Sequence, residues 1–267
     1  MPKKNTSDEN GRLSGTQSIE RALTLMREIA AHNRTGSRLL DLASRTGLQR
    51  PTVHRMLKCL TVEDMVLQDP DSHRYFLGPM VFELGLTAAP RYNLREVCHP
   101  AMTRIAEATG DTVFLTQRSG LDSVCVDRQE GTFPIKTFTL EIGTRRPLGV
   151  GTGSLAILCA LSEDEVKHVI ASITPRLAEY GLTPTSLLAQ VKRAQKLGYA
   201  VREMPTLSGV RSVGHALHNQ SGVAFAALSV SAISSRMSEK RVAELATMLK
   251  NETRLVEKQL ANGTDRR

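Results

Sequence analysis

Residues 38–62 constrain the fold of this chain more strongly than any other stretch. The spacing of apolar residues predicts a short helix over 38–45, and Thr46-Gly47 follows it directly. Glycine tolerates the left-handed backbone that ends a helix sharply, so a tight turn is expected there. A second helix is predicted over about 49–62, with Pro51 in its first turn, where a missing amide hydrogen costs nothing. Two short helices joined by such a turn are typical of a helix-turn-helix.

The flanking segments extend this pattern to a winged helix-turn-helix. Apolar residues recur at helical spacing over 19–30 and predict a preceding helix that starts near Thr16 or Ser18. On the other side, 65–67 and 75–77 are short apolar runs that flank a polar tip, the pattern of a small β-hairpin. Helix, helix, turn, helix and hairpin is the element order of the winged form.

The predicted helix over 49–62 has one apolar and one basic face. Four apolar residues fall within about 100° of a helical wheel and form the expected buried stripe. They are Val53, Met56, Leu57 and Leu60. In a helix-turn-helix, the N-terminal end of the second helix enters the major groove. Arginine pairs there with guanine and glutamine with adenine, while other basic residues reach the DNA phosphates. The expected DNA contacts are Arg38, Gln49, Arg50, Pro51, Thr52, His54, Arg55, Lys58 and Arg74.

The positive charge of the chain is concentrated in the same region. The whole chain has a formal net charge of +8, and the stretch from Arg34 to Lys58 holds six basic residues against one acid, Asp41, a local excess of +5. Such an excess favours an acidic partner such as DNA. A small helical bundle with a solvated basic face is the alternative, but it does not explain the glycine turn, the helix lengths and the hairpin together.

The rest of the composition excludes several classes of protein. The four cysteines, Cys59, Cys98, Cys125 and Cys159, are far apart and lack metal-ligand spacing, so no metal site is expected. No apolar run approaches the roughly 20 residues of a membrane span, and no signal-peptide apolar region is found. The sequence therefore predicts a cytoplasmic protein with reduced thiols and no membrane partner.

The chain after residue 78 predicts a linker followed by an α+β domain. Strands are expected at 112–117, 123–127, 135–140, 211–217 and 223–229. Helices are expected at 80–88, 94–109, 154–161, 163–172, 185–197 and 239–260. The expected division is a disordered tail over 1–14, a winged helix-turn-helix DNA-binding domain over 15–78, a linker helix over 79–92 and a larger α+β domain over 93–262.

Several stretches of the chain carry a resemblance to a known family. They are GTQSIERALTLMREIAAHNRTGSRLLDLASRTGLQRPTVHRMLKCLTVEDMV, GTRRPLGVGTGSLAILCAL at 143–161 and LSGVRSVGHALHNQSGVAFAALSVSA at 207–232. Through them the chain resembles the IclR family of bacterial transcriptional regulators over roughly residues 15–260. The resemblance implies a winged helix-turn-helix, a linker helix and a GAF-like effector-binding domain. It also implies a homodimer or a dimer of dimers on palindromic, double-stranded promoter DNA.

A glycine-rich loop in the second stretch is a candidate ligand site. Gly149, Gly151 and Gly153 alternate just before a helix predicted to start near Ser154. Glycines let ligand atoms approach the backbone, and a helix N-terminus favours an anion, so a carboxylate fits there. A purely structural turn is the alternative interpretation of the same glycines.

The family resemblance implies which residues surround this loop. It places one pocket residue in a strand near Ser212 and two serines, matching Ser229 and Ser231, on the same side of the last strand. Relatives often carry acids ahead of the first of these strands, whereas this chain has Arg202-Glu203-Met204-Pro205-Thr206. Arg202 is expected either to pair with an anionic effector or to lie on the surface. The expected effector contacts are Gly151, Thr152, Gly153, Ser154, Arg202, Ser212, Ser229 and Ser231.

An enzymatic C-terminal domain is the alternative from another functional class. The candidate bases are His168, His215 and His218, and the candidate nucleophiles are Cys125, Cys159 and Ser154. His215 and His218 are three apart in a predicted strand and are expected to face opposite sides of it. No nucleophile elbow, HExxH or P-loop signature is found, so neither catalysis nor a cofactor is expected.

Together these features predict a DNA-binding transcriptional regulator. A small organic or aromatic acid is expected to bind the C-terminal domain and to shift the linker helices between two arrangements. The resemblance also implies control of a catabolic operon, because many relatives govern the breakdown of carbon compounds. The sequence leaves repression or activation open, as it does dimer or tetramer.

Overall fold

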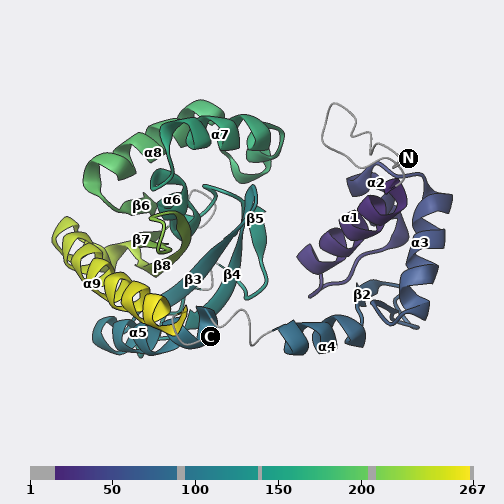
Figure 1. The fold of residues 1–267 in the computed structure, drawn as a ribbon, viewed down its shortest axis with the longest axis horizontal. Helices are drawn as coiled ribbons and strands as arrows, with labels where there is room; N and C mark the ends of the chain where they lie inside the picture. The colour runs from purple at the N-terminus through teal and green to yellow at the C-terminus, as the bar shows by residue number, and fades with distance from the viewer. Residues whose placement is uncertain (1–15, 89–93, 138–139, 204–208, 265–267) are drawn as a thin grey trace, which may run out of the picture. The chain divides into compact units, whose positions relative to one another are not determined.

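The chain divides into two compact units, Met1–Tyr92 and Asn93–Arg267 (Figure 1). The computed structural model describes residues 16–88, 94–137, 140–203 and 209–264. The predicted disordered tail over 1–14, the end of the predicted linker helix at 89–92 and the segment 204–206 lie outside these residues. Within the described ranges, no helix is long and apolar enough to cross a membrane.

The N-terminal unit has the predicted element order of a winged helix-turn-helix. Its elements are α1 (Gln17–Ala31), α2 (Leu39–Thr46), α3 (Arg50–Val62), β1 (Val66–Gln68), β2 (Tyr75–Leu77) and α4 (Pro79–Ala88). α2 ends at Gly47, whose φ of 68° is the left-handed conformation expected at the turn. Ser37 and Tyr75 exchange backbone hydrogen bonds of 3.1 and 2.8 Å, which tie the β1–β2 hairpin to the loop before α2. The predicted helices and hairpin are confirmed.

An apolar core joins α1, α2 and α3. Its completely buried side chains include Leu25, Ile29, Leu42, Val53 and Leu57. Burying each of them stabilises the unit by roughly 1.5–3 kcal/mol relative to exposure. Met56 and Leu60 are half-buried against the same cluster. The predicted apolar stripe of α3 is therefore confirmed.

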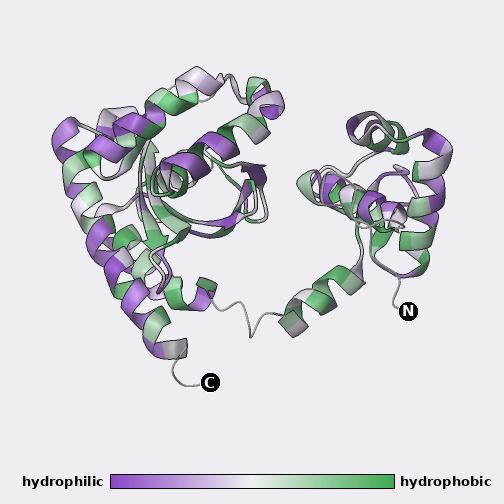
Figure 2. Cartoon of the chain, turned by 45° about the horizontal axis from the view of Figure 1, so that its top comes forward, coloured by the Kyte–Doolittle hydropathy of each residue, from purple (hydrophilic) through white to green (hydrophobic). Residues whose placement is uncertain are grey.

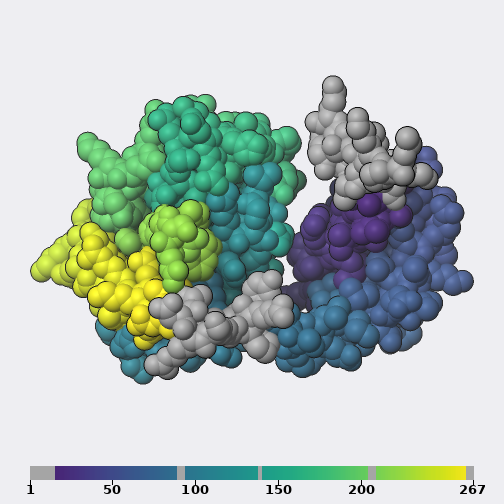
Figure 3. Space-filling view, viewed as in Figure 1, coloured from purple at the N-terminus to yellow at the C-terminus, as the bar shows by residue number. Residues whose placement is uncertain are grey.

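The C-terminal unit is an antiparallel six-stranded sheet in the order β5-β4-β3-β8-β7-β6, with helices on both faces. The strands are β3 (Thr112–Ser119), β4 (Asp122–Gln129), β5 (Arg145–Pro147), β6 (Ala200–Glu203), β7 (Val210–His218) and β8 (Ala224–Ile233). The helices are α5 (Leu94–Thr109), α6 (Thr152–Cys159), α7 (Glu163–Leu177), α8 (Pro184–Leu197) and α9 (Glu239–Thr264), with short 3₁₀ turns η2 (Ala178–Tyr180) and η3 (Ser234–Arg236). α7 and α8, in green, and α9, in yellow, form part of the surface of this unit (Figure 3). The expected α+β class is confirmed.

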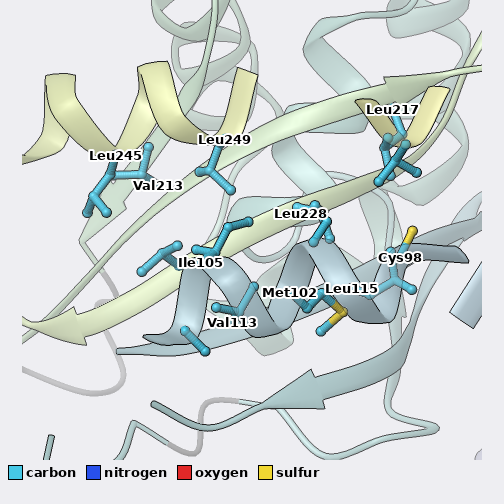
Figure 4. Close-up of a cluster of buried hydrophobic side chains, with 14 of the residues drawn as sticks. Cys98, Met102, Ile105, Val113, Leu115, Val213, Leu217, Leu228, Leu245 and Leu249 are labelled. Carbon is cyan, nitrogen blue, oxygen red and sulfur yellow. The ribbon is translucent and has the colours of Figure 1, made fainter. Parts of the chain in front are cut away.

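Side-chain alternation along the central strands assigns neighbouring residues to different faces. Along β7, Val213 and Leu217 belong to the apolar cluster under α5 and α9, whereas Ala216 packs with α6, α7 and α8. Figure 4 shows the first cluster, in which Met102 of α5 and Leu249 of α9 lie beside the strands. One face of the sheet is therefore covered by a mainly apolar cluster under α5 and α9, and the other face packs against α6, α7 and α8.

The prediction of a strand over 135–140 is wrong in the part that the structure describes. Residues 135–137 form no strand, because β5 occupies the outer edge of β4, where Ser123 pairs with Arg146. The segment passes over the sheet instead, and the Thr137 hydroxyl donates to the Ser231 carbonyl at 2.9 Å. β5 and β6 were not predicted, since they are only three and four residues long and carry charged side chains.

A buried carboxylate joins the first strand of this unit to its last helix. The Asp111 side chain is 1% exposed and accepts from Arg236 Nε at 3.1 Å and from Arg241 Nη2 at 2.7 Å. Both guanidinium groups also donate to the Thr109 carbonyl, at 3.1 and 2.9 Å. The end of α5 and the start of β3 are thereby fixed to η3 and α9.

We expect Asp111→Ala to lower the free energy of unfolding of the C-terminal unit by about 3 kcal/mol, because removing one partner of a buried ion pair leaves the other charges uncompensated. Urea denaturation followed by circular dichroism measures this change. Asp164→Ala is the control, since the Asp164 carboxylate is 99% exposed and lies 3.8 Å from Lys167. Such a surface pair contributes less than about 1 kcal/mol, and equal losses in the two variants would contradict the role given to Asp111.

Candidate DNA interface and effector pocket

α3 presents a basic face to solvent. Gln49 precedes the helix in an extended conformation, and its exposed side chain makes no capping hydrogen bond. Arg50, Arg55 and Lys58 are exposed and form no ion pair with any residue that the structure describes. Cationic side chains without acidic partners at the N-terminal end of such a helix are suited to base edges and phosphates.

The other residues predicted on this surface vary in exposure. Pro51 and His54 are exposed on α3, whereas Thr52 is half-buried. Arg38 is exposed just before α2, and its backbone N–H donates to the Asp41 carboxylate at 3.2 Å. Their contacts with DNA remain a prediction.

Arg74 has a structural role in the hairpin. Its Nη1 donates to the carbonyls of Gly36 at 2.9 Å and Thr35 at 3.3 Å, so this guanidinium holds the hairpin against the loop before α2. The Arg74 guanidinium thus already has two protein partners, and its contact with a DNA phosphate remains a prediction. His73, beside it, is exposed at the tip, with φ of 55°.

Backbone conformation and close packing explain the three glycines of the loop before α6. Gly149 and Gly151 both have φ of 94°, a conformation that side chains with a Cβ rarely adopt. A Cβ on Gly153 would lie 2.7 Å from Thr116 Oγ1, so only glycine lets α6 approach β3 this closely. The Ser154 hydroxyl accepts from the Gly149 amide at 2.7 Å and closes the loop. The structural interpretation of these glycines is thus confirmed, and it is compatible with a ligand site at the same place.

Two adjoining hollows lie at this loop, on the face of the sheet away from α5 and α9. The first is lined by Thr116, Ser123, Cys125, Leu140, Thr144, Arg146, Val150, Gly151, Gly153 and Ser154. The second is lined by Phe114, Leu140, Arg146, Gly151, Thr152, Gly153, Ser212, Ser229 and Ser231. Seven of the eight predicted effector contacts are therefore brought together.

The hydroxyl groups of the hollows are deeply buried. Ser212 and Ser231 lie opposite each other on β7 and β8, and their hydroxyl oxygens are 2.6 Å apart. Ser229 also points into the second hollow. In the first hollow, the Thr116 hydroxyl is buried and has no hydrogen-bond partner in the described structure. Buried polar groups without partners are rare and costly, which makes Thr116 a candidate for ligand contact.

Two arginines bring positive charge to this region. Arg146 of β5 lines both hollows, and burial lowers the pKa of its guanidinium. Arg202 is also buried, and its Nη1 donates to the Gly149 carbonyl at 3.2 Å. Arg202 is not among the lining residues, so the structure places it behind the glycine loop rather than on the surface or in the hollow.

Sequence reasoning missed the pocket residues that lie outside the recognised loop and strands. The missed polar residues are Thr116, Ser123, Thr144 and Arg146. The doublet Arg145-Arg146 gives the one sequence signal for any of these residues, because successive residues of a strand face opposite sides. Only the pairing of β5 with β4 decides that Arg146 faces the hollows while Arg145 pairs with Asp122 at 3.2 Å.

The histidines do not form a catalytic group with the candidate nucleophiles. A β-bulge between Leu217 and His218 shifts the register of β7, so the prediction that His215 and His218 face opposite sides is wrong. Both face α9, where His215 Nδ1 lies 2.9 Å from Thr253 Oγ1 and His218 Nδ1 lies 3.0 Å from Glu257 Oε1. Cys125 and Ser154 line the hollow on the other face of the sheet.

The thiols favour the protonated form, and the described residues contain no metal centre. Burial raises the pKa of Cys125 and of Cys159 to about 11, so neither thiol supplies a thiolate near neutral pH. His168, the remaining candidate base, lies exposed on α7. Among the described side chains, no group of three or more His, Cys, Asp or Glu is arranged to hold a metal ion.

Comparison with known proteins finds one family over most of the chain. The IclR helix-turn-helix domain matches residues 18–70, and the family described as bacterial transcriptional regulator IclR C-terminal matches residues 86–257. The chain is also similar to the HTH-type transcriptional repressor AllR of Escherichia coli (strain K12). The two are 26% identical over 246 residues, which cover 90% of this chain and 89% of AllR.

Solved structures share the fold. An IclR family transcriptional regulator from Brucella abortus matches with a TM-score of 0.76 and 22% identity, covering 92% of this chain and 93% of the other. An IclR homolog from Microbacterium hydrocarbonoxydans, complexed with 4-hydroxybenzoate, matches with a TM-score of 0.70 and 19% identity, covering 92% of this chain and all of the other. At these identities the likeness establishes the fold.

We expect Thr116→Val to raise the free energy of unfolding by about 1 kcal/mol, because it replaces an unpartnered buried hydroxyl by a methyl group of the same shape. Ser212→Ala should lower it by a similar amount, since the Ser231 hydroxyl then loses its partner. Thermal and urea denaturation of the ligand-free protein measure both changes. A loss of stability in Thr116→Val would show that a bound water or another group satisfies this hydroxyl.

The stability of the C-terminal unit should fall as the pH drops below about 6.5, the pKa of an unfolded histidine. Burial lowers the pKa of His215 in the fold, so the unfolded chain takes up a proton more readily and is favoured by acid. In His215→Gln, the free energy of unfolding should depend less steeply on pH just below about 6.5. Identical slopes in the two proteins, measured by urea titration at each pH, would rule out this contribution.

Proposed function

Because this chain belongs to the IclR family of bacterial transcriptional regulators, we propose that it binds a palindromic site in promoter DNA and that a small organic acid modulates this binding. It is a transcriptional regulator with a helix-turn-helix, and this family consists of regulators rather than enzymes. The observation that carries the proposal is the exposed basic face of α3, whose three cations lack acidic partners among the described residues. A regulator of this kind acts on DNA in the cytoplasm.

In the proposed DNA complex, the N-terminal end of α3 enters the major groove. Gln49, Arg50 and Arg55 contact base edges there, and Lys58 contacts phosphate farther along the helix. The DNA-binding domain spans 15–78, the linker helix 79–92 and a GAF-like effector-binding domain 93–262. This division assigns DNA binding and effector binding to separate units.

A palindromic site requires two copies of α3, and the N-terminal unit has apolar surface that a second copy would cover. Phe82, Leu84 and Leu86 of α4 are 69%, 53% and 58% exposed, and Figure 2 shows that this helix is largely hydrophobic. Ile19 and Leu23 of α1 are also exposed. Exposed apolar side chains on neighbouring turns mark interaction surfaces, so we infer a homodimer, alone or as a dimer of dimers.

The proposed effector site is formed by the two hollows at the N-terminal end of α6. Their serine and threonine hydroxyls supply hydrogen bonds, and the helix N-terminus favours a carboxylate. The 4-hydroxybenzoate bound by the Microbacterium relative supports an organic or aromatic acid as the effector. Binding then favours one arrangement of the two units over another, which couples the acid to a catabolic operon.

The protein should retard the intergenic DNA upstream of its own gene, with an affinity that falls steeply as the salt concentration rises. Arg50→Ala and Arg55→Ala should each weaken this binding roughly tenfold or more, because a base contact by arginine contributes about 1–3 kcal/mol. Arg193→Ala, an exposed change of equal charge on α8, is the control and should bind like the unchanged protein. Equal binding by all three variants would contradict the assignment of α3 as the reading helix.

A further inference from the structure

The charge of the N-terminal unit changes sign where α3 ends. Residues 34–58 carry a local excess of +5, whereas residues 63–77 have four acids and one arginine, an excess of −3 with histidine neutral. The latter stretch contains the β1–β2 hairpin and is the wing of the helix-turn-helix. Its charged residues are Glu63, Asp64, Asp69, Asp71 and Arg74. DNA phosphates are anionic, so a wing of this charge repels the backbone that α3 attracts.

The one arginine of the wing does not neutralise its acids. Arg74 donates to the carbonyls of Gly36 at 2.9 Å and Thr35 at 3.3 Å, which directs its guanidinium toward the loop before α2. It forms no ion pair with any acid that the structure describes. The carboxylates of the wing therefore keep their negative charge toward an approaching DNA.

Two of these acids stand where the fold gains nothing from their charge. Glu63 and Asp64 directly follow the C-terminal end of α3, where the helix dipole disfavours a negative charge. Both are exposed, and neither pairs with a cation among the described residues. Helix stability therefore does not account for acids at this position.

The tip of the wing carries one acid that the fold uses and one that it does not. The Asp69 carboxylate accepts from the Ser72 N–H at 2.8 Å and from the Ser72 hydroxyl at 2.6 Å. These hydrogen bonds close the turn and lower the pKa of Asp69, so its carboxylate is ionised near neutral pH. Asp71 is exposed, and its carboxylate pairs with no residue that the structure describes. Asp71 is thus the acid whose charge can be removed without opening the turn.

The wing is fixed to both elements that are expected to meet the DNA. Its first strand follows α3 after three residues, and Tyr75 of its second strand exchanges backbone hydrogen bonds with Ser37, directly before Arg38 and α2. At the tip, the Asp69 N–H donates to the Arg74 carbonyl at 2.9 Å, so Asp71 lies only two residues beyond this closed pair. Carboxylates held beside the reading helix in this way act on phosphates within about 8 Å in physiological salt.

We propose that the wing opposes DNA binding, with Asp71 at its tip repelling the phosphates that flank the groove entered by α3. This inference rests on the proposed DNA-binding function. The affinity for DNA is then lower than the basic face of α3 alone would give. Phosphates carry no sequence information, so the repulsion acts on every DNA sequence and leaves the choice of site to the base contacts of α3.

Fluorescence anisotropy of the full chain with two labelled duplexes tests this proposal. One duplex is the intergenic DNA upstream of the gene, and the other is a random sequence of the same length. We expect Asp71→Asn to bind both duplexes about twofold or more tightly than the unchanged protein, because one repulsive charge is removed. Asp71→Lys should bind about fivefold or more tightly, with a steeper dependence on salt, because a cation there gains a phosphate.

Asp164→Asn is the matched control, since it makes the same change of charge on the other unit, where Asp164 is 99% exposed. It should bind both duplexes like the unchanged protein, and melting temperatures verify that all variants are folded. Equal gains in Asp164→Asn and Asp71→Asn would show an effect of net charge alone and overturn the role given to the wing. If the unchanged protein binds DNA and neither Asp71 variant binds more tightly, the wing proposal is wrong and the DNA-binding function stands. If the unchanged protein binds neither duplex, both are wrong.

Discussion

The antiparallel pairing of β3, β7 and β8 is the constraint on which the C-terminal unit depends. Because successive side chains of a strand face opposite sides, one register fixes both the apolar core and the candidate pocket. Val113 and Val230 face α5 and α9, while their neighbours Phe114 and Ser229 face the hollows. A slip of one residue would put serines into the core and valines into the pocket. The apolar core therefore fixes the position of the polar groups behind it.

The same arrangement makes the pocket face costly to maintain without a ligand. It buries hydroxyl groups and the Arg202 guanidinium. The opposite face, with its mainly apolar cluster, contributes hydrophobic stabilisation that offsets this cost. Natural proteins concentrate buried polar groups at functional sites, and here they occur at the N-terminal end of α6. This concentration is the physical basis for proposing an effector site at that place.

The sequence was most informative where local patterns decide the structure. Helical periodicity and the Gly47 turn predicted α1, α2 and α3 correctly, as the buried stripe of α3 shows. Long-range pairing decided the features that were missed. Nothing local indicates the bulge that turns His218 toward α9, or that β5 rather than 135–140 occupies the edge of β4. For the same reason the glycine loop and the family resemblance indicated seven residues that line the hollows, whereas Arg146, which depends on the pairing of a three-residue strand, was not predicted.

The clamp at Asp111 has a consequence for the order in which the chain acquires its functions during synthesis. Asp111 is separated along the chain by 125 positions from Arg236 and by 130 positions from Arg241, its two ion-pair partners. The second edge of the central strand β3 is covered only when β8 has been synthesised and pairs with it. The core of the N-terminal unit, in contrast, closes between residues 25 and 75. Contacts between distant residues form late, and domains generally fold as they emerge from the ribosome. The N-terminal unit therefore folds while the C-terminal unit is still being synthesised, so a nascent chain acquires its helix-turn-helix before its proposed effector site is formed.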